Sequence, residues 1–244
     1  GRDMPTFQST LSQAAKLASS EDVLVTIGIY PKFPSTGFGY IEAGEPLSKM
    51  DGIEFFKVKQ FVEKPDDKMA KKYMETGTFY WNSGMFVFSI ETFQKAVKTH
   101  CPWLMDLMKQ IEPVINSSKL NDTLKEVYSE LQKLSIDYAL MEKANNLVMA
   151  KGTFPWDDLG CWTALENHFV KDANQNAIAG NAECIDSSKN IIVSEGGLIA
   201  AIGVDNLVIV QSGSATLVCP KKRAQDVKKL VAQLRSKAAY KNIL

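Results

Sequence analysis

The pattern of hydrophobic and polar residues differs between two parts of the chain. In the first part, residues 6–18 place apolar side chains at helical intervals, and residues 23–30 form a nearly unbroken apolar, β-branched run. Such a run is typical of a strand that is buried on both faces of a parallel sheet. A helix followed by a buried strand predicts an α/β layered fold.

The first part continues with further strands and helices. We predict strands near residues 40–42, 55–61, 85–88 and 147–151, and helices near residues 66–76, 91–99, 103–115 and 121–133. Asp66 and Asp67 are residue types that cap the start of a helix, and Gly77 is the type that ends one.

After residue 174 the pattern changes to short apolar runs that recur about every eight residues, with turn-forming residues between them. Regular spacing of this kind predicts an all-β module. A last helix should turn Val227, Leu230, Val231 and Leu234 inward. We therefore predict a domain over residues 1–172, followed by a β module with a terminal helix over residues 173–244.

Composition narrows the possible functions. The chain has 244 residues, of which 45% are hydrophobic, which is enough for a sizeable core. Its 28 basic and 28 acidic side chains balance, so neither nucleic acid nor an anionic membrane is an expected partner. It has no apolar run long enough to span a membrane.

The four cysteines are scattered and form no CxxC pair, which favours a reducing cytoplasm; they are Cys101, Cys161, Cys184 and Cys219. With two histidines only, a histidine metal site or a catalytic triad is disfavoured.

The sharpest short motif is FVEKP at residues 61–65, where a predicted strand ends in adjacent opposite charges. Ligands of open α/β sheets bind beyond the carboxyl ends of the strands, so both side chains can reach a cleft there. Lys64 is a compact cation suited to a phosphate, and Glu63 is an acceptor suited to sugar hydroxyls. A solvated ion pair beside a helix start is the alternative interpretation.

Two more motifs combine glycine with polar or aromatic residues. TGFGYI at residues 36–41 includes Gly39, whose backbone can approach a ligand closely, although a simple turn is the better interpretation of this motif taken by itself. WNSGMF at residues 81–86 is expected just before a strand, where Asn82 could bind a hydroxyl and Gly84 could leave room for a sugar ring. Its alternative is a turn beside a core tryptophan.

Carboxylates mark the last two motifs. WDDLGCW at residues 156–162 places Asp157 and Asp158 between tryptophans, and Mg²⁺ is usually held by one or two carboxylates together with substrate phosphates. A turn or helix cap is the alternative. SIDYALMEK at residues 135–143 predicts a helix capped by Ser135, in which Asp137 and Glu142 are interpreted as structural rather than catalytic.

Taken together and in this order, the five motifs and the β module resemble the bacterial mannose-1-phosphate guanylyltransferases. The resemblance extends along nearly the whole chain, including residues 200–203 and 206–210 in its tail. It implies part of a doubly wound, Rossmann-like nucleotidyltransferase domain followed by a small β-helix-like module. It also implies a reaction in which GTP and mannose 1-phosphate form GDP-mannose and pyrophosphate, with Mg²⁺ or another divalent cation.

The resemblance assigns roles by motif. Lys64 would bind the sugar phosphate and act in catalysis, Glu63 would bind sugar hydroxyls, and Asp158 would be a catalytic metal ligand. Asp157 stands where the family often has a small polar residue, which leaves its role in doubt. The other residues expected to line the sugar pocket are Gly39, Tyr40, Asn82 and Gly84.

The sequence departs from the family at its start. The family's guanine and triphosphate site lies in a Gly-rich loop followed by Arg, and a second metal-binding Asp would precede residue 1; nothing here matches either. We therefore expect a fragment that is inactive alone, or a chain completed by another piece. A related enzyme with another sugar or base, and a non-catalytic module that binds a sugar phosphate or assembles with a partner, remain alternatives. The resemblance also hints at homodimers formed through the tail.

Overall fold

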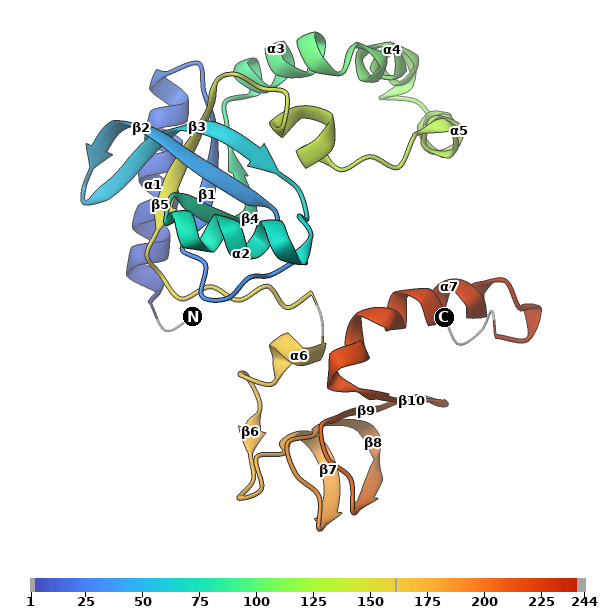
Figure 1. The fold of residues 1–244 in the computed structure, drawn as a ribbon. Helices are drawn as coiled ribbons and strands as arrows, with labels where there is room; N and C mark the ends of the chain where they lie inside the picture. The colour runs from blue at the N-terminus through green and yellow to red at the C-terminus, as the bar shows by residue number, and fades with distance from the viewer. Residues whose placement is uncertain (1–2, 161, 241–244) are drawn as a thin grey trace. The chain divides into compact units, whose positions relative to one another are not determined.

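The chain separates into two compact units, residues 1–156 and residues 157–244 (Figure 1). The computed structural model describes residues 3–160 and 162–240, so Gly1 and Cys161 of the WDDLGCW motif lie outside the described residues. The domain boundary predicted near residue 172 falls within the second unit, next to β6 (Val170–Lys171), which is the first strand of the second sheet.

The described part of the first unit contains five strands whose ladder closes on itself in the order β1-β4-β2-β3-β5. These strands are β1 (Leu24–Ile29), β2 (Tyr40–Met50), β3 (Ile53–Val62), β4 (Phe79–Val87) and β5 (Leu147–Gly152). β1 is buried along its whole length, as its apolar run predicts. It is parallel to β5 but antiparallel to β4, so the expectation of a purely parallel sheet around β1 is corrected to a mixed one.

Side chains that alternate along β1 face two separate hydrophobic clusters. Val25 and Ile27 pack in the cluster that receives α1 (Met4–Ser20) and α2 (Asp67–Thr76). Leu24 belongs to the other cluster, beside buried residues of α3 (Ile90–His100) and of η2 (Asp137–Met141). Two packed faces therefore explain why the run is apolar throughout, except for the buried Thr26.

The local signals of the first unit are partly confirmed. Asp66 caps α2 by accepting a hydrogen bond from the Met69 N–H at 2.8 Å, and Gly77 ends the helix in the left-handed region at φ 70°. Ser135 does not cap a helix: Ile136 is the N-cap, and residues 137–141 form a single π-helical turn. The remaining helices are α4 (Pro102–Ile111), η1 (Glu112–Val114) and α5 (Leu120–Glu130).

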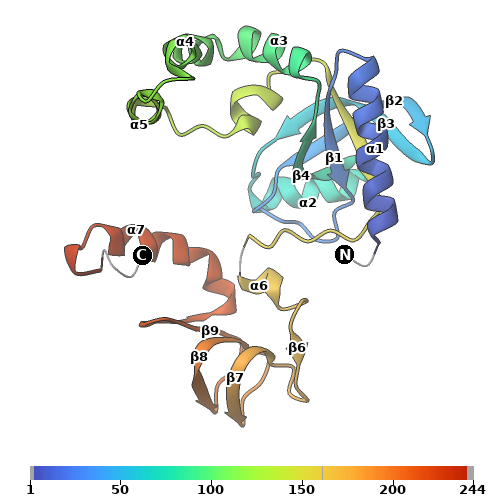
Figure 2. The same ribbon diagram turned by 180° about the vertical axis from the view of Figure 1, so that it is seen from behind.

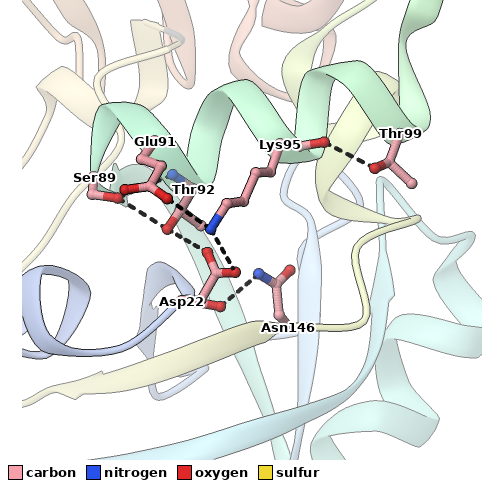
Figure 3. Close-up of polar contacts among 7 residues, drawn as sticks. All are labelled: Asp22, Ser89, Glu91, Thr92, Lys95, Thr99 and Asn146. Atoms are coloured by element: carbon pink, nitrogen blue, oxygen red, sulfur yellow. Dashed lines mark hydrogen bonds and ion pairs between the residues drawn. The ribbon is translucent and has the colours of Figure 1, made fainter.

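Hydrogen bonds and an ion pair connect the start of α3 to the loops before β1 and β5 (Figure 3). The carboxylate of Asp22 accepts a hydrogen bond from the Thr92 hydroxyl at 2.7 Å and forms an ion pair with Lys95 at 3.3 Å. Asn146 donates to the Asp22 main-chain carbonyl at 2.8 Å, and Ser89 caps α3. The Thr92 hydrogen bond, opposed by burial and reinforced by Lys95, holds the pKa of Asp22 below its ordinary value.

The second unit carries the predicted β module, drawn in orange and red in Figures 1 and 2. β7 (Ala177–Ile185), β8 (Ile191–Ile202) and β9 (Leu207–Ser212) are parallel, while β6 and β10 (Ala215–Pro220) pair antiparallel at the edges. Glu195, Gly196 and Gly197 are among the turn-forming residues between the predicted apolar runs, but they lie inside β8, where Gly196 has φ 91°. This glycine therefore bends one long strand instead of separating two short ones.

Two buried asparagines join successive turns of the module. Asn190 donates from Nδ2 to Asn176 Oδ1 and to the Val204 carbonyl, both at 3.0 Å, and its Oδ1 accepts from the Leu207 N–H at 2.9 Å. Each asparagine directly precedes a parallel strand. The pair thus satisfies backbone groups that the turns would otherwise leave buried and unpaired.

Short helices complete the second unit. α7 (Val227–Arg235) keeps Val227, Val231 and Leu234 half-buried, but Leu230 is 43% exposed, which corrects its predicted inward orientation. The others are α6 (Trp162–Leu165), η3 (Lys221–Asp226) and η4 (Ala238–Tyr240).

Candidate sugar-phosphate site

Glu63 and Lys64 follow the last residue of β3 and form a close ion pair. Lys64 Nζ donates to Glu63 Oε1 at 2.5 Å, with 8% of the Glu63 side chain and 56% of the Lys64 side chain exposed. A solvated pair would expose both groups, whereas here the carboxylate is buried and the ammonium faces outward. Lys64 also has φ 48°, a costly conformation for a residue other than glycine and one that often marks a functional site.

The surroundings of Lys64 favour its charged form. The hydrogen bond that Lys64 donates to Glu63 raises the pKa of the Lys64 ammonium above its ordinary value, against the opposing effect of burial. The negative charge of Glu63 and the nearby Tyr138 and Asp137 add to this rise in pKa. Lys64 therefore remains a cation throughout the physiological pH range and is available to an anion.

Gly39 packs directly against both of the other polar motifs. A β-carbon at position 39 would lie under 3.0 Å from Glu63 Oε2 and 3.3 Å from Asn82 Cβ. The Gly39 carbonyl also accepts a hydrogen bond from the Asn82 N–H at 2.8 Å. The missing side chain at Gly39 thus lets three separate motifs meet in one cluster, while the close approach of its backbone to a ligand stays a prediction.

Asn82 is the polar centre of this cluster. Its Oδ1 accepts from the Thr26 hydroxyl and from the Gly84 N–H, each at 3.1 Å, and its Nδ2 donates to Asp137 Oδ1 at 2.9 Å. The motif was expected just before a strand, but it lies inside β4, which begins at Phe79. Gly84 has φ 73° and open space around its missing side chain, so backbone conformation is the reason for glycine there.

Tyr40 does not line the cluster with its side chain. The residue is 0% exposed, and its hydroxyl donates to the Ser35 carbonyl at 3.0 Å. Burial raises the pKa of this hydroxyl, and the ring packs against Tyr73 with 5.4 Å between ring centroids. The sequence-based assignment of Tyr40 to substrate contact is therefore corrected to a core position that supports the start of β2.

The paired carboxylates Asp157 and Asp158 belong to the second unit. Asp157 contacts His168 Nε2 at 3.2 Å, whereas the Asp158 side chain is exposed. Within residues 3–160 and 162–240, no group of three or more His, Cys, Asp or Glu side chains could hold a metal ion. A single exposed carboxylate does fit Mg²⁺, which keeps several waters and takes further ligands from substrate phosphates.

Three residues outside the predicted site support the cluster. Asp137 and Glu142 were interpreted as structural rather than catalytic, and their contacts are supporting ones: Asp137 Oδ1 accepts from Asn82 Nδ2, and Glu142 Oε1 accepts the Glu63 N–H at 3.2 Å. Thr26 is the third. The available signal for Thr26 was a polar residue in the middle of an otherwise apolar strand.

Comparison with known proteins places this arrangement in a family. A family model described as nucleotidyl transferase matches residues 3–175. The chain belongs to the nucleotidyl transferase family. Residues 180–234 match a second model, described as a MannoseP isomerase/GMP-like β-helix domain. The fold class predicted from the sequence, an α/β nucleotidyltransferase domain followed by a β-helix-like module, is thereby confirmed.

Individual relatives of this chain carry consistent names. The chain is 35% identical over 237 residues to a mannose-1-phosphate guanylyltransferase of Escherichia coli, covering 96% of this chain and 50% of that protein. It is 37% identical over 241 residues to the enzyme of that name in Salmonella muenchen, covering 96% and 49%. The chain therefore spans about half the length of the curated relatives that it matches, and the predicted resemblance is confirmed.

Solved structures agree with this assignment. A crystal structure from Thermus thermophilus, titled as a mannose-1-phosphate geranyltransferase, superposes with a TM-score of 0.78 at 32% identity, covering 95% of this chain and 65% of that chain. A mannose-6-phosphate isomerase from Helicobacter pylori matches with a TM-score of 0.53 at 29% identity, covering 64% and 60%. Among the described residues of this chain, no helix is long and apolar enough to cross a membrane.

Proposed function

We propose that this chain is the sugar-phosphate-binding part of an enzyme that forms GDP-mannose and pyrophosphate from GTP and mannose 1-phosphate. The observation that carries the proposal is the convergence of Gly39, Glu63, Lys64 and Asn82 in one cluster of the first unit. The cluster offers a cation, a carboxylate acceptor and an amide donor, which are the groups that a phosphorylated sugar requires. The names of the relatives support mannose 1-phosphate and a guanine nucleotide as substrates.

The proposed reaction requires no nucleophile from the protein. A phosphate oxygen of mannose 1-phosphate attacks the α-phosphorus of GTP, a new P–O bond forms, and the bond to the pyrophosphate leaving group breaks. Both reactants are anions, so catalysis depends on positioning and on charge neutralisation. The Lys64 ammonium would hold the sugar phosphate, and Glu63 would accept hydrogen bonds from sugar hydroxyls.

A divalent cation belongs to the same proposal. Asp158 is the residue of this chain that would hold Mg²⁺, and the ion would neutralise phosphate charge when bound. We also propose a cytoplasmic location, which the free thiols of Cys101, Cys184 and Cys219 support. Self-association through the second unit completes the proposal.

The test is substrate turnover by the protein at its full natural length. Release of GDP-mannose and pyrophosphate would be measured with GTP and mannose 1-phosphate, and compared with UTP, ATP, dTTP and glucose 1-phosphate. We expect the first pair to be preferred. Turnover of another pair alone would favour the related enzyme, and calorimetric binding of mannose 1-phosphate without any turnover would favour the non-catalytic module.

A further inference from the structure

We propose that Thr26 and Asp137 are positioning residues that fix the Asn82 side-chain amide so that it presents a single N–H donor to the sugar phosphate. The inference rests on the proposed function, because it assigns a task to residues behind the same site. It starts from the contacts of Asn82, whose partners come from β1, from β4 itself and from η2.

The orientation of the Asn82 amide follows from its partners. The Gly84 N–H can only donate, so the atom facing it must be the carbonyl oxygen of the amide. The Asp137 carboxylate at 2.9 Å can only accept when ionised, so the atom facing it must be the nitrogen. A flipped amide would oppose donor to donor and acceptor to acceptor. The two contacts therefore determine one orientation independently.

The hydrogen-bonding capacity of Asn82 is then nearly exhausted. Both lone pairs of Oδ1 are engaged, by Thr26 and by Gly84, and one of the two Nδ2 hydrogens is engaged by Asp137. These contacts among the described residues leave the second Nδ2 hydrogen unused, and Asn82 is 9% exposed, so we infer that this N–H serves a ligand. Asn82 can therefore recognise an acceptor oxygen of the substrate, whereas the buried Glu63 carboxylate recognises a donor hydroxyl.

The π-helical turn η2 supports both halves of this recognition. Leu140 and Met141 anchor the turn in the core, each 1% exposed. Asp137 at its start holds Asn82, and Glu142 just after its end accepts the Glu63 N–H at 3.2 Å. One rigid turn thus fixes the donor relative to the acceptor, which is the arrangement that discriminates between sugar hydroxyls.

The experiment compares substrate analogues across matched variants of the full-length protein. Asp137→Ala removes the contact to Asn82, while Asp137→Asn keeps an acceptor oxygen. Thr26→Val removes the hydroxyl at constant shape, while Thr26→Ser keeps it. Asn82→Ala is the reference, and Asp122→Ala replaces an exposed carboxylate of α5 as a control. The measurement is kcat/KM for mannose 1-phosphate and for its monodeoxy analogues, with the KM for GTP.

We expect Asp137→Ala and Thr26→Val to raise the KM for mannose 1-phosphate about tenfold while the KM for GTP is unchanged. One substrate hydroxyl should be identified by its analogue: removing it should lower kcat/KM in the parent but not in Asn82→Ala. Removing the same hydroxyl should then have little effect on kcat/KM in Asp137→Ala and Thr26→Val. In Asp137→Asn and Thr26→Ser, most of the parent's preference for this hydroxyl should remain. A uniform loss over all analogues, or an unchanged hydroxyl preference in Asp137→Ala, would overturn the inference.

Turnover of mannose 1-phosphate by the parent protein tests the proposed function independently of the positioning role. If the parent does not use mannose 1-phosphate, the proposed function fails, and the positioning role is then judged by the Asn82 side-chain amide signals in ¹⁵N NMR. These signals should shift in Asp137→Ala and Thr26→Val and stay near the parent values in Thr26→Ser. If the Asn82 side-chain amide signals do not shift in folded Asp137→Ala, this result alone would overturn the positioning role.

Discussion

The backbone of Gly39 faces the carboxylate of Glu63 so closely that no side chain fits between them. A β-carbon at position 39 would lie under 3.0 Å from Glu63 Oε2, a separation that real β-carbons do not show. The glycine motif and the FVEKP motif are therefore two halves of one structural unit. A side chain added at Gly39 would therefore displace the Glu63 side chain before any other group.

Gly39→Ala should impair sugar binding while the fold remains intact. The added methyl must push the Glu63 carboxylate out of place, and a displacement of about 1 Å at such a site costs on the order of 100-fold in rate. We expect kcat/KM for mannose 1-phosphate to fall by about that factor in the full-length protein. Gly37→Ala is the matched control, because its nearest neighbour is Ser35 Oγ at 3.6 Å. Equal losses in both variants would contradict the contact argument.

Lys64→Ala should abolish most turnover. The variant removes the cation of the cluster, and loss of one preorganised electrostatic group costs about 3 kcal/mol of transition-state stabilisation. Rates of pyrophosphate release at saturating substrates would measure the effect. Lys57→Ala is the control, since that lysine is 63% exposed and lies 3.9 Å from its partner Glu45. Near-normal turnover by Lys64→Ala would count against the phosphate role.

Asp158→Asn should weaken activity and Mg²⁺ dependence together. The amide lacks the negative charge that a hard cation prefers, so the Mg²⁺ concentration for half-maximal activity should rise about tenfold. The measurement is a Mg²⁺ titration of turnover at fixed GTP and mannose 1-phosphate. Asp122→Asn, which changes an exposed carboxylate of the first unit, should leave the titration unchanged. An unaltered curve for Asp158→Asn would rule out the metal role.

Local patterns predicted much of the fold because their causes are local. The helix bounded by Asp66 and Gly77 and the buried strand β1 follow from capping chemistry and from apolar periodicity. The mixed pairing of β1 did not follow, because strand direction depends on partners far away in sequence. The π-helical turn at residues 137–141 was likewise missed, since its signals are those of an ordinary helix.

The motifs that meet in the candidate site could be named from the sequence, but the contacts between them could not. Glu63, Lys64, Gly39 and Asn82 carry chemistry that their motifs reveal. Tyr40 was misplaced because alternation along β2, which decides which face a side chain takes, cannot be fixed without the register. Thr26 and Asp137 act through Asn82, and such contacts become visible only when three distant segments are placed together.

Asn190→Ala should destabilise the second unit strongly. Asn190 is 0% exposed, and its side chain makes three hydrogen bonds. Their loss leaves the Leu207 N–H without this acceptor, whereas Asn176 Oδ1 and the Val204 carbonyl each keep one backbone donor. We expect a loss of about 2–4 kcal/mol in the free energy of unfolding, from three lost hydrogen bonds and the unsatisfied Leu207 N–H. Denaturant titrations would measure it. Asn181→Ala, at an exposed position of β7, should change stability by less than about 1 kcal/mol.

Asp22→Asn should destabilise the first unit at neutral pH and lose this effect in acid. The pKa of Asp22 is lowered in the folded state from its ordinary value of 3.8, so its ionised form stabilises the fold above that pH. This stabilisation is lost as the pH falls through the lower folded value, where both states become protonated. The stability gap between parent and variant should therefore be constant above about pH 5 and narrow below pH 3.8. Asn146→Ala breaks the neighbouring contact to the Asp22 carbonyl without changing this titrating group, so its gap should not narrow. Denaturant titrations between pH 7 and pH 3 would distinguish the two, and a gap for Asp22→Asn that is independent of pH would contradict the assignment.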